Sequence, residues 1–146
     1  MSVYFAYGSN MSSARLLARV SGAAALGRAR VSGWSLRFNK RGRDGTGKAN
    51  LVPAPGALCW GVAWTLPDDA WPRLDRFEPG YERHTFRLQR SAGDEIDAQA
   101  YLHACPPAAP SIAPSDTYLD HLLNGALEHD LPDDYVAKIR SFAKPS

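Results

Sequence analysis

The stretch YFAYGSNM, from Tyr4 to Met11, decides how the rest of the chain is organised. Val3 to Tyr7 is rich in aromatic and β-branched residues and apolar on both faces, which predicts a central strand. The strand stops at Gly8, which permits a backbone turn that other residues resist, and a helical pattern follows almost at once. Such a junction leaves several backbone N–H groups without acceptors, and these can hold an anion or a polarised carbonyl. The stretch therefore predicts the floor of an active site.

Length and composition set the broad class. The 146 residues suit one domain spanning 1–146, and the apolar and charged fractions of 45% and 22% are ordinary for a globular protein. A formal net charge of +2 gives no support for nucleic-acid or membrane partners. Cys59 and Cys105 lie in apolar contexts and are expected to be small core residues. No apolar run is long enough to span a membrane and no signal peptide is apparent, so a cytoplasmic protein is expected.

The middle of the chain is predicted to be mainly strands. Alternating or apolar patterns place them at 23–31 (an ambiguous segment), 34–38, 49–52, 58–66, 81–90 and 96–103. Pro53 and Pro55 are expected to close the short strand before them. Lys40 to Lys48, rich in glycine and arginine, is predicted to be a mobile surface loop. One face of Leu58–Leu66 is small, so another backbone or a ligand can come close to it.

Helices are predicted on either side of these strands. The first follows the opening turn, capped by Asn10, Ser12 or Ser13, and the second begins after Pro67 and ends at Pro79-Gly80. Two more, over about 115–127 and 132–142, follow a stiff proline-rich linker that contains Pro106, Pro107, Pro110 and Pro114. Strands first and helices later indicate an α+β fold with a curved or closed sheet.

Three apparent motifs fail on inspection. Gly42–Lys48 reads GRDGTGK and has the spacing of a phosphate-binding loop, but Ala49 replaces the Ser or Thr that would hold magnesium. Ser9 lacks the G-x-S-x-G context of a serine nucleophile, and no histidine is tied to it. His84 and His103 lack a third ligand, so no metal site is expected.

Glu78 is the candidate for proton chemistry. Trp71, Leu74 and Glu78 stand at i, i+3 and i+7, so a helix would place them on one face, which the two apolar residues mark as buried. Burial and the negative end of the helix dipole would both raise the pKa of such a carboxyl, as suits a general acid/base. The alternative is a surface glutamate at a frayed helix end, with Phe77 pointing inward. The pattern leaves both interpretations open.

YGSN at Tyr7–Asn10 together with LDRFE at Leu74–Glu78 resembles the γ-glutamylcyclotransferase family. The likeness extends to CWGVAWTL (59–66), AYLH (100–103) and LNGALEHDLPDDY (123–135). Pro79 departs from the family pattern, in which glycine usually follows the glutamate. The Y-G-S-N form also differs from the turns of the glutathione-degrading and γ-glutamylamine branches.

The resemblance implies a small, mixed, partly closed β-barrel with flanking helices. It also implies an enzyme that cyclises a γ-glutamyl group to 5-oxoproline and releases the amine, with no cofactor and no metal. Glu78 would be the catalytic general acid/base. The implied substrate-binding residues are Tyr4, Phe5, Ala6, Tyr7, Gly8, Ser9, Asn10, Tyr81, Tyr101 and Tyr118. For any single tyrosine, a core aromatic with a solvated hydroxyl is the simpler interpretation.

Two other functions stay open at this stage. The same turn could serve a non-catalytic module that binds a small carboxylate, with Glu78 exposed and ordinary. Alternatively, the enzyme could act on a biosynthetic γ-glutamyl intermediate, because loops such as Arg41–Lys48 would set the leaving-group side of the pocket. The expected partner is a small-molecule γ-glutamyl substrate, and a homodimer stays open because nothing in the sequence sets the oligomeric state.

Overall fold

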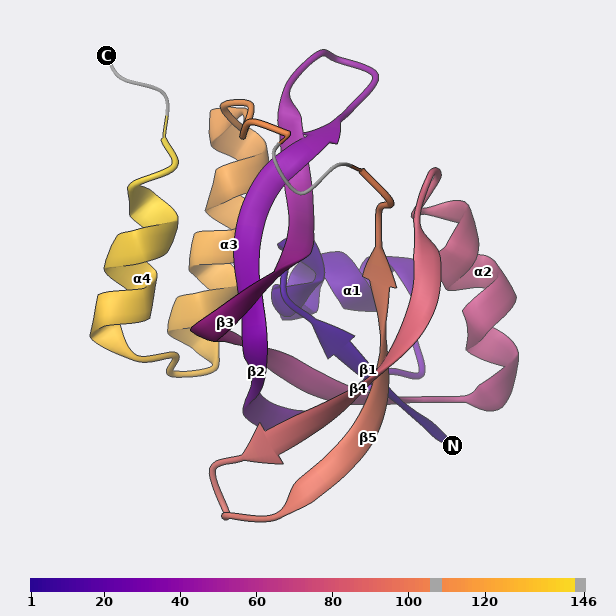
Figure 1. Cartoon of the computed structure of the whole chain (residues 1–146). Helices are drawn as coiled ribbons and strands as arrows, with labels where there is room; N and C mark the ends of the chain where they lie inside the picture. The colour runs from indigo at the N-terminus through magenta and orange to yellow at the C-terminus, as the bar shows by residue number, and fades with distance from the viewer. Residues whose placement is uncertain (106–108, 144–146) are drawn as a thin grey trace.

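The computed structural model describes residues 1–105 and 109–143 and contains a closed five-stranded barrel (Figure 1). Around the barrel the strands follow the order β1-β3-β2-β4-β5. Their bounds are β1 Ser2–Ala6, β2 Ala24–Arg41, β3 Gly47–Leu66, β4 Glu82–Arg90 and β5 Glu95–Leu102. All neighbours pair antiparallel except β1 and β5, which pair parallel at Tyr4 and Gln99 and close the barrel. The sheet is therefore mixed, and the predicted α+β barrel is confirmed.

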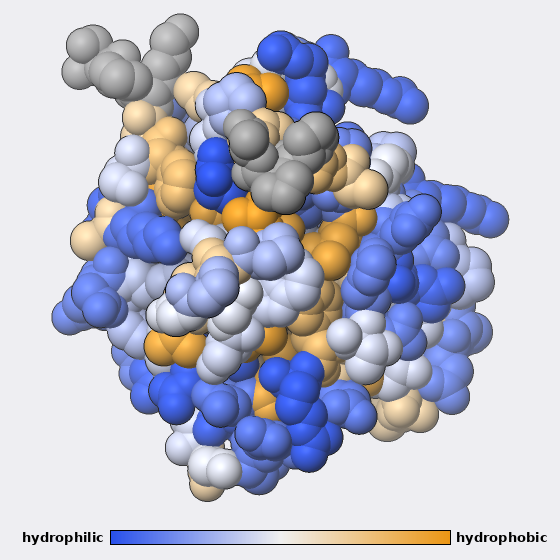
Figure 2. All heavy atoms as spheres, viewed as in Figure 1, coloured by the Kyte–Doolittle hydropathy of each residue, from blue (hydrophilic) through white to orange (hydrophobic). Residues whose placement is uncertain are grey.

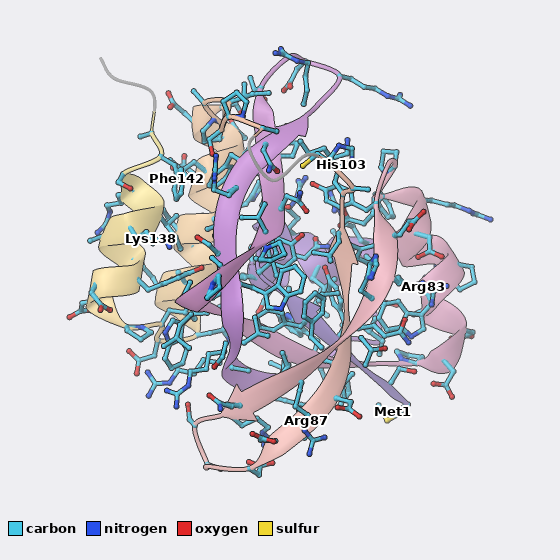
Figure 3. All side chains as sticks on the ribbon, in the orientation of Figure 1. Met1, Arg83, Arg87, His103, Lys138 and Phe142 are labelled. Atoms are coloured by element: carbon cyan, nitrogen blue, oxygen red, sulfur yellow. The ribbon has the colours of Figure 1, made fainter. Side chains whose placement is uncertain are left out.

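Helices flank the barrel on several sides. The bounds are η1 Ser9–Met11, α1 Ser13–Arg19, η2 Asp68–Ala70, α2 Trp71–Arg76, α3 Asp116–Glu128 and α4 Asp133–Arg140. In Figure 1, α3 and α4 lie together on one side of the barrel and α2 lies on the opposite side. Beyond α4, the ring of Phe142 packs 4.7 Å from that of Phe38 on β2 (Figure 3). None of the helices in the described ranges is long and apolar enough to cross a membrane.

The strands β2 and β3 are longer than predicted. Pro53 and Pro55 do not end a strand; both are exposed within β3, in a part that lies beside β2 but is not paired with β1, and proline is tolerated at such an edge. The two segments predicted on either side of Gly33 are one strand, bent by a register shift at that glycine, whose φ is +84°. The loop predicted over Lys40–Lys48 is also shorter, because Lys40 pairs with Lys48 and leaves only 42–46 outside the strands.

The linker and the helix caps follow the prediction in part. Ser12 caps α1 and Ser115 caps α3, each through its side-chain oxygen. Pro106 and Pro107 of the predicted linker lie outside the described residues. The part that follows is held to the barrel, since Ile112 N–H donates to the carbonyl of Phe38 at 2.8 Å.

Small residues let the chain pack tightly around the opening turn. On β3, a Cβ atom at Gly61 would collide with the Ala6 carbonyl oxygen and the Phe5 ring, which confirms the close approach predicted for this face. On α3, a Cβ atom at Gly125 would lie 2.5 Å from the Met11 Cβ and 2.6 Å from the Ser12 nitrogen. Both glycines therefore fix where β1 and η1 stand relative to the rest of the fold.

Gly125→Ala tests this packing. Alanine favours the helix over glycine, but the added methyl must push α3 away from η1, so we expect a net loss of about 1–3 kcal/mol in the free energy of unfolding. Urea denaturation measures it. Asn124→Ala, on the exposed side of the same helix, is the matched control and should change stability by less than about 0.5 kcal/mol. A Gly125→Ala protein as stable as the parent would contradict the packing argument.

Candidate active site

The end of β1 opens into a cavity of about 200 Å³. Its walls come from the end of β1 and the turn into η1, from α1, from the β2–β3 hairpin and from the turn after α2. Tyr81 just before β4, Tyr101 on β5 and Tyr118 on α3 complete them. The lining residues are Tyr4, Phe5, Tyr7, Gly8, Ser9, Asn10, Arg15, Arg19, Lys40, Gly42, Arg43, Lys48, Ala49, Phe77, Glu78, Pro79, Tyr81, Tyr101 and Tyr118. Of the residues predicted from the sequence, Ala6 alone does not line it; Ala6 is buried and pairs with Val62 of β3.

The turn after β1 presents free backbone donors. In the part of the chain that the structure describes, the N–H groups of Gly8, Ser9 and Asn10 have no hydrogen-bond acceptor. Gly8 does not adopt a left-handed conformation, since its φ is −113°. Its lack of a side chain matters for space instead: a Cβ atom there would lie 3.1 Å from the Ala49 Cβ and 3.5 Å from the Tyr118 hydroxyl. The turn can therefore receive a small group with developing negative charge.

Glu78 lies in the turn that follows α2, not in the helix. The helix ends at Arg76, so the predicted buried face is correct for Trp71 and Leu74, which are both buried. Glu78 lies beyond the helix, in a tight turn. The Glu78 side chain is 17% exposed, whereas Phe77 is 45% exposed. Glu78 therefore occupies the inward position and Phe77 the outward one.

Asn10 joins the turn to Glu78. Its amide nitrogen donates to Glu78 Oε1 at 3.1 Å and to the Tyr4 hydroxyl at 3.0 Å. Its amide oxygen accepts from Arg19 at 3.2 Å, and Arg19 also forms a 3.8 Å ion pair with Glu78. The carboxylate is thus held in one orientation, facing the cavity.

Burial dominates the proton affinity of Glu78. Desolvation raises the pKa of the carboxyl from 4.5 to about 7, although Arg19, Arg15, Lys40 and the hydrogen bond from Asn10 all act to lower it. A carboxyl group with this pKa exchanges its proton readily near neutral pH. It can therefore act both as a base and as an acid within one reaction.

The tyrosines are fixed by hydrogen bonds of their own. The Tyr81 hydroxyl donates to the Ala49 carbonyl at 2.7 Å, and the Tyr118 hydroxyl accepts from the Ala49 N–H at 3.0 Å. The Tyr7 hydroxyl donates to the Tyr101 carbonyl, so these rings brace one another around the cavity. Burial raises the pKa of all of them, that of Tyr118 to about 12. They stay protonated and shape the cavity rather than carry protons.

Tyr101 is braced from the other side by α2 and β4. Its hydroxyl donates to Asp75 at 2.6 Å, and Asp75 forms a 3.2 Å ion pair with Arg83. Figure 3 shows Arg83 on β4 beside α2. This chain of contacts fixes the strand and the helix that flank Glu78.

Several cavity residues were not predicted from the sequence. Arg15 and Arg19 stand one turn apart on α1, immediately after the predicted turn, and that spacing could have identified them. Arg15 donates to the Ser9 hydroxyl at 3.0 Å, and in the described part of the chain no histidine forms a hydrogen bond with Ser9. Within residues 1–105 and 109–143, no cluster of His, Cys, Asp and Glu could hold a metal ion.

The sequence and the fold are similar to those of known proteins. A family model described as the AIG2-like family matches residues 58–139. Gamma-glutamylcyclotransferase of Homo sapiens is 31% identical over 149 residues, which cover 95% of this chain and 77% of the relative; that of Bos taurus is 30% identical with the same coverage. A solved structure of a gamma-glutamyl cyclotransferase, 28% identical, superposes with a TM-score of 0.88 over 99% of this chain and 89% of the other.

The barrel and the family match define a protein of the AIG2-like class. Within that class, the chain belongs to the gamma-glutamylcyclotransferase family and is an enzyme. An AIG2-like protein of Mus musculus, 22% identical with a TM-score of 0.59 over 80% of this chain and 89% of the other, shares the fold.

The stability of the protein should depend on pH through Glu78. Because its pKa is higher in the folded state than the ordinary 4.5, protonated Glu78 stabilises the fold at low pH, and this contribution is lost as the pH rises through about 7. Relative to Glu78→Gln, which cannot ionise, the parent protein should lose about 2 kcal/mol of unfolding free energy between about pH 5 and about pH 8. Urea denaturation of both proteins measures the difference. A difference that does not change with pH would show that Glu78 is not desolvated.

Proposed function

We propose that this protein is a γ-glutamylcyclotransferase that converts a small γ-glutamyl compound to 5-oxoproline and a free amine. The observation that supports this function most directly concerns Glu78, which is buried beside the turn at Tyr7–Asn10. Its pKa is about 7, and Asn10 holds its carboxyl group toward the cavity. The family membership supports the reaction class. The binding-module alternative needs an exposed, ordinary Glu78, which the burial of this side chain disfavours.

The reaction needs a folded substrate. The α-nitrogen of the γ-glutamyl group must approach its own γ-carbonyl carbon to close a five-membered ring. A small cavity walled by rigid tyrosines favours this compact shape and so lowers the entropic cost of reaching a near-attack geometry. Both reacting groups belong to the substrate, so this proposal needs no protein nucleophile and no cofactor.

Proton transfer is the task proposed for Glu78. The ionised carboxylate takes a proton from the α-ammonium, and the freed amine forms a C–N bond with the γ-carbonyl carbon. The resulting oxyanion would be stabilised by the free N–H groups of Gly8, Ser9 and Asn10. Glu78 then returns that proton to the departing nitrogen as the original γ-amide bond breaks, and it next carries the second proton of the ring nitrogen to the released amine, which leaves as an ammonium ion. Protons balance over the cycle, and Glu78 ends as it began.

Glu78→Gln tests the assignment. Glutamine keeps the shape and the hydrogen bond to Asn10 but cannot carry the proton, so we expect a loss of about 10²–10⁴-fold in kcat. The assay follows 5-oxoproline released from γ-glutamyl-alanine. Glu82→Gln, an exposed glutamate at the start of β4, is the matched control and should keep parent activity. Equal turnover by Glu78→Gln and the parent would contradict the proposed role.

The pH profile provides an independent test. Because the base must be ionised before it can accept a proton, kcat/KM should fall about tenfold per unit as the pH drops below the Glu78 pKa of about 7. Initial rates at low substrate concentration give the profile. A profile that is flat from about pH 5 to about pH 7 would exclude Glu78 as the base.

A further inference from the structure

The β2–β3 hairpin lines part of the cavity with cations. It contributes Lys40, Arg43 and Lys48 together with Gly42, whereas the γ-glutamyl end is lined by the turn at Tyr7–Asn10. In Figure 1 the hairpin projects beyond the barrel, and Figure 2 shows strongly hydrophilic residues at its tip. These side chains belong to neither the proposed proton transfer nor the proposed oxyanion site.

Lys40 is held in place over the cavity. Its stem packs against Gly80, since a Cβ atom at that glycine would lie 3.0 Å from the Lys40 Cε. Its ammonium stands 5.3 Å from the centre of the Tyr81 ring, which lines the cavity. The residue therefore presents a positive charge at the cavity, near enough to Glu78 to act on its carboxyl.

The hairpin cations differ in how far they are already neutralised. Lys48 forms a 3.5 Å ion pair with Asp44 and stands 4.5 Å from the Tyr118 ring centre. No carboxylate in the described part of the chain forms an ion pair with Lys40 or Arg43. Lys40 and Arg43 therefore have charge available for a ligand.

The cavity carries more positive charge than a γ-glutamyl substrate with a neutral leaving group would match. The cavity is lined by five cationic side chains, Arg15, Arg19, Lys40, Arg43 and Lys48, against one carboxyl, that of Glu78. The γ-glutamyl group itself is neutral overall, with one ammonium and one carboxylate. The excess positive charge is therefore complementary to a leaving amine that is itself anionic.

We propose that Lys40 and Arg43 select γ-glutamyl substrates whose leaving amine carries two carboxylates, such as an acidic amino acid. This inference rests on the proposed function and specifies its substrate class. One carboxylate is present on any amino acid that leaves; the second, on the side chain, is the group that the two unpaired cations would recognise. Each contact is partly exposed, so each contributes modestly and is screened by salt.

A matched pair of substrates isolates the second charge. γ-Glutamyl-glutamate and γ-glutamyl-glutamine have nearly the same shape and differ by one negative charge. At low salt the parent should show a kcat/KM about five- to tenfold higher for γ-glutamyl-glutamate, measured by release of 5-oxoproline. In the Lys40→Gln/Arg43→Gln double variant this ratio should fall to about one. Arg41→Gln, on the same hairpin but outside the cavity lining, should keep the parent ratio.

The outcomes separate the two proposals. A ratio near one in the parent, or a ratio that the double variant leaves unchanged, would overturn the selectivity while leaving the cyclisation intact. Release of 5-oxoproline from neither dipeptide nor from γ-glutamyl-alanine would overturn the proposed function and the selectivity with it. A ratio that falls in the double variant and with added salt, but not in Arg41→Gln, supports recognition by the hairpin cations.

Discussion

The site depends on one amide group, the side chain of Asn10. It donates to Glu78 and to Tyr4, and so joins the β1–η1 turn to the turn after α2 and to the barrel wall. A buried carboxyl group is costly unless it is hydrogen-bonded, and the position of Asn10 makes burial of Glu78 tolerable without neutralising it fully. Arg19, on α1, completes the arrangement by contacting both Asn10 and Glu78. Loss of this junction would free the carboxyl to turn toward solvent, where its pKa would be ordinary.

The barrel serves to bring these segments together. β1 is central, between β3 and β5, so the turn at its end opens at the barrel mouth with strands on both sides. Gly61 lets β3 approach the end of β1, Gly125 lets α3 approach η1, and the backbone of Ala49 fixes the hydroxyls of Tyr81 and Tyr118. The cavity is therefore formed by rigid elements, which suits a reaction whose main requirement is the folding of its substrate.

Sequence patterns predicted the parts of this site that depend on local information. Trp71 and Leu74 marked the buried face next to Glu78, and the motif at Tyr7–Asn10 marked the turn. The continuity of β3 through Pro53 was not predictable, because whether a proline ends a strand depends on which side its neighbour lies. The spacing of Arg15 and Arg19 after the turn was a usable signal, but the contact of Arg19 with Glu78 was not predictable, because α1 and α2 are distant in sequence and only the fold sets how they face each other.

The most direct measurement is the pKa of Glu78 itself. ¹³C NMR of protein labelled at the glutamate side-chain carboxyls can follow each resonance with pH, and Glu78→Gln assigns the signal by its disappearance. A buried carboxyl held by Asn10 at the cavity should titrate near 7. A value near the ordinary 4.5 would mean that Glu78 is solvated, and it would contradict the role of this residue as the acid/base of the site.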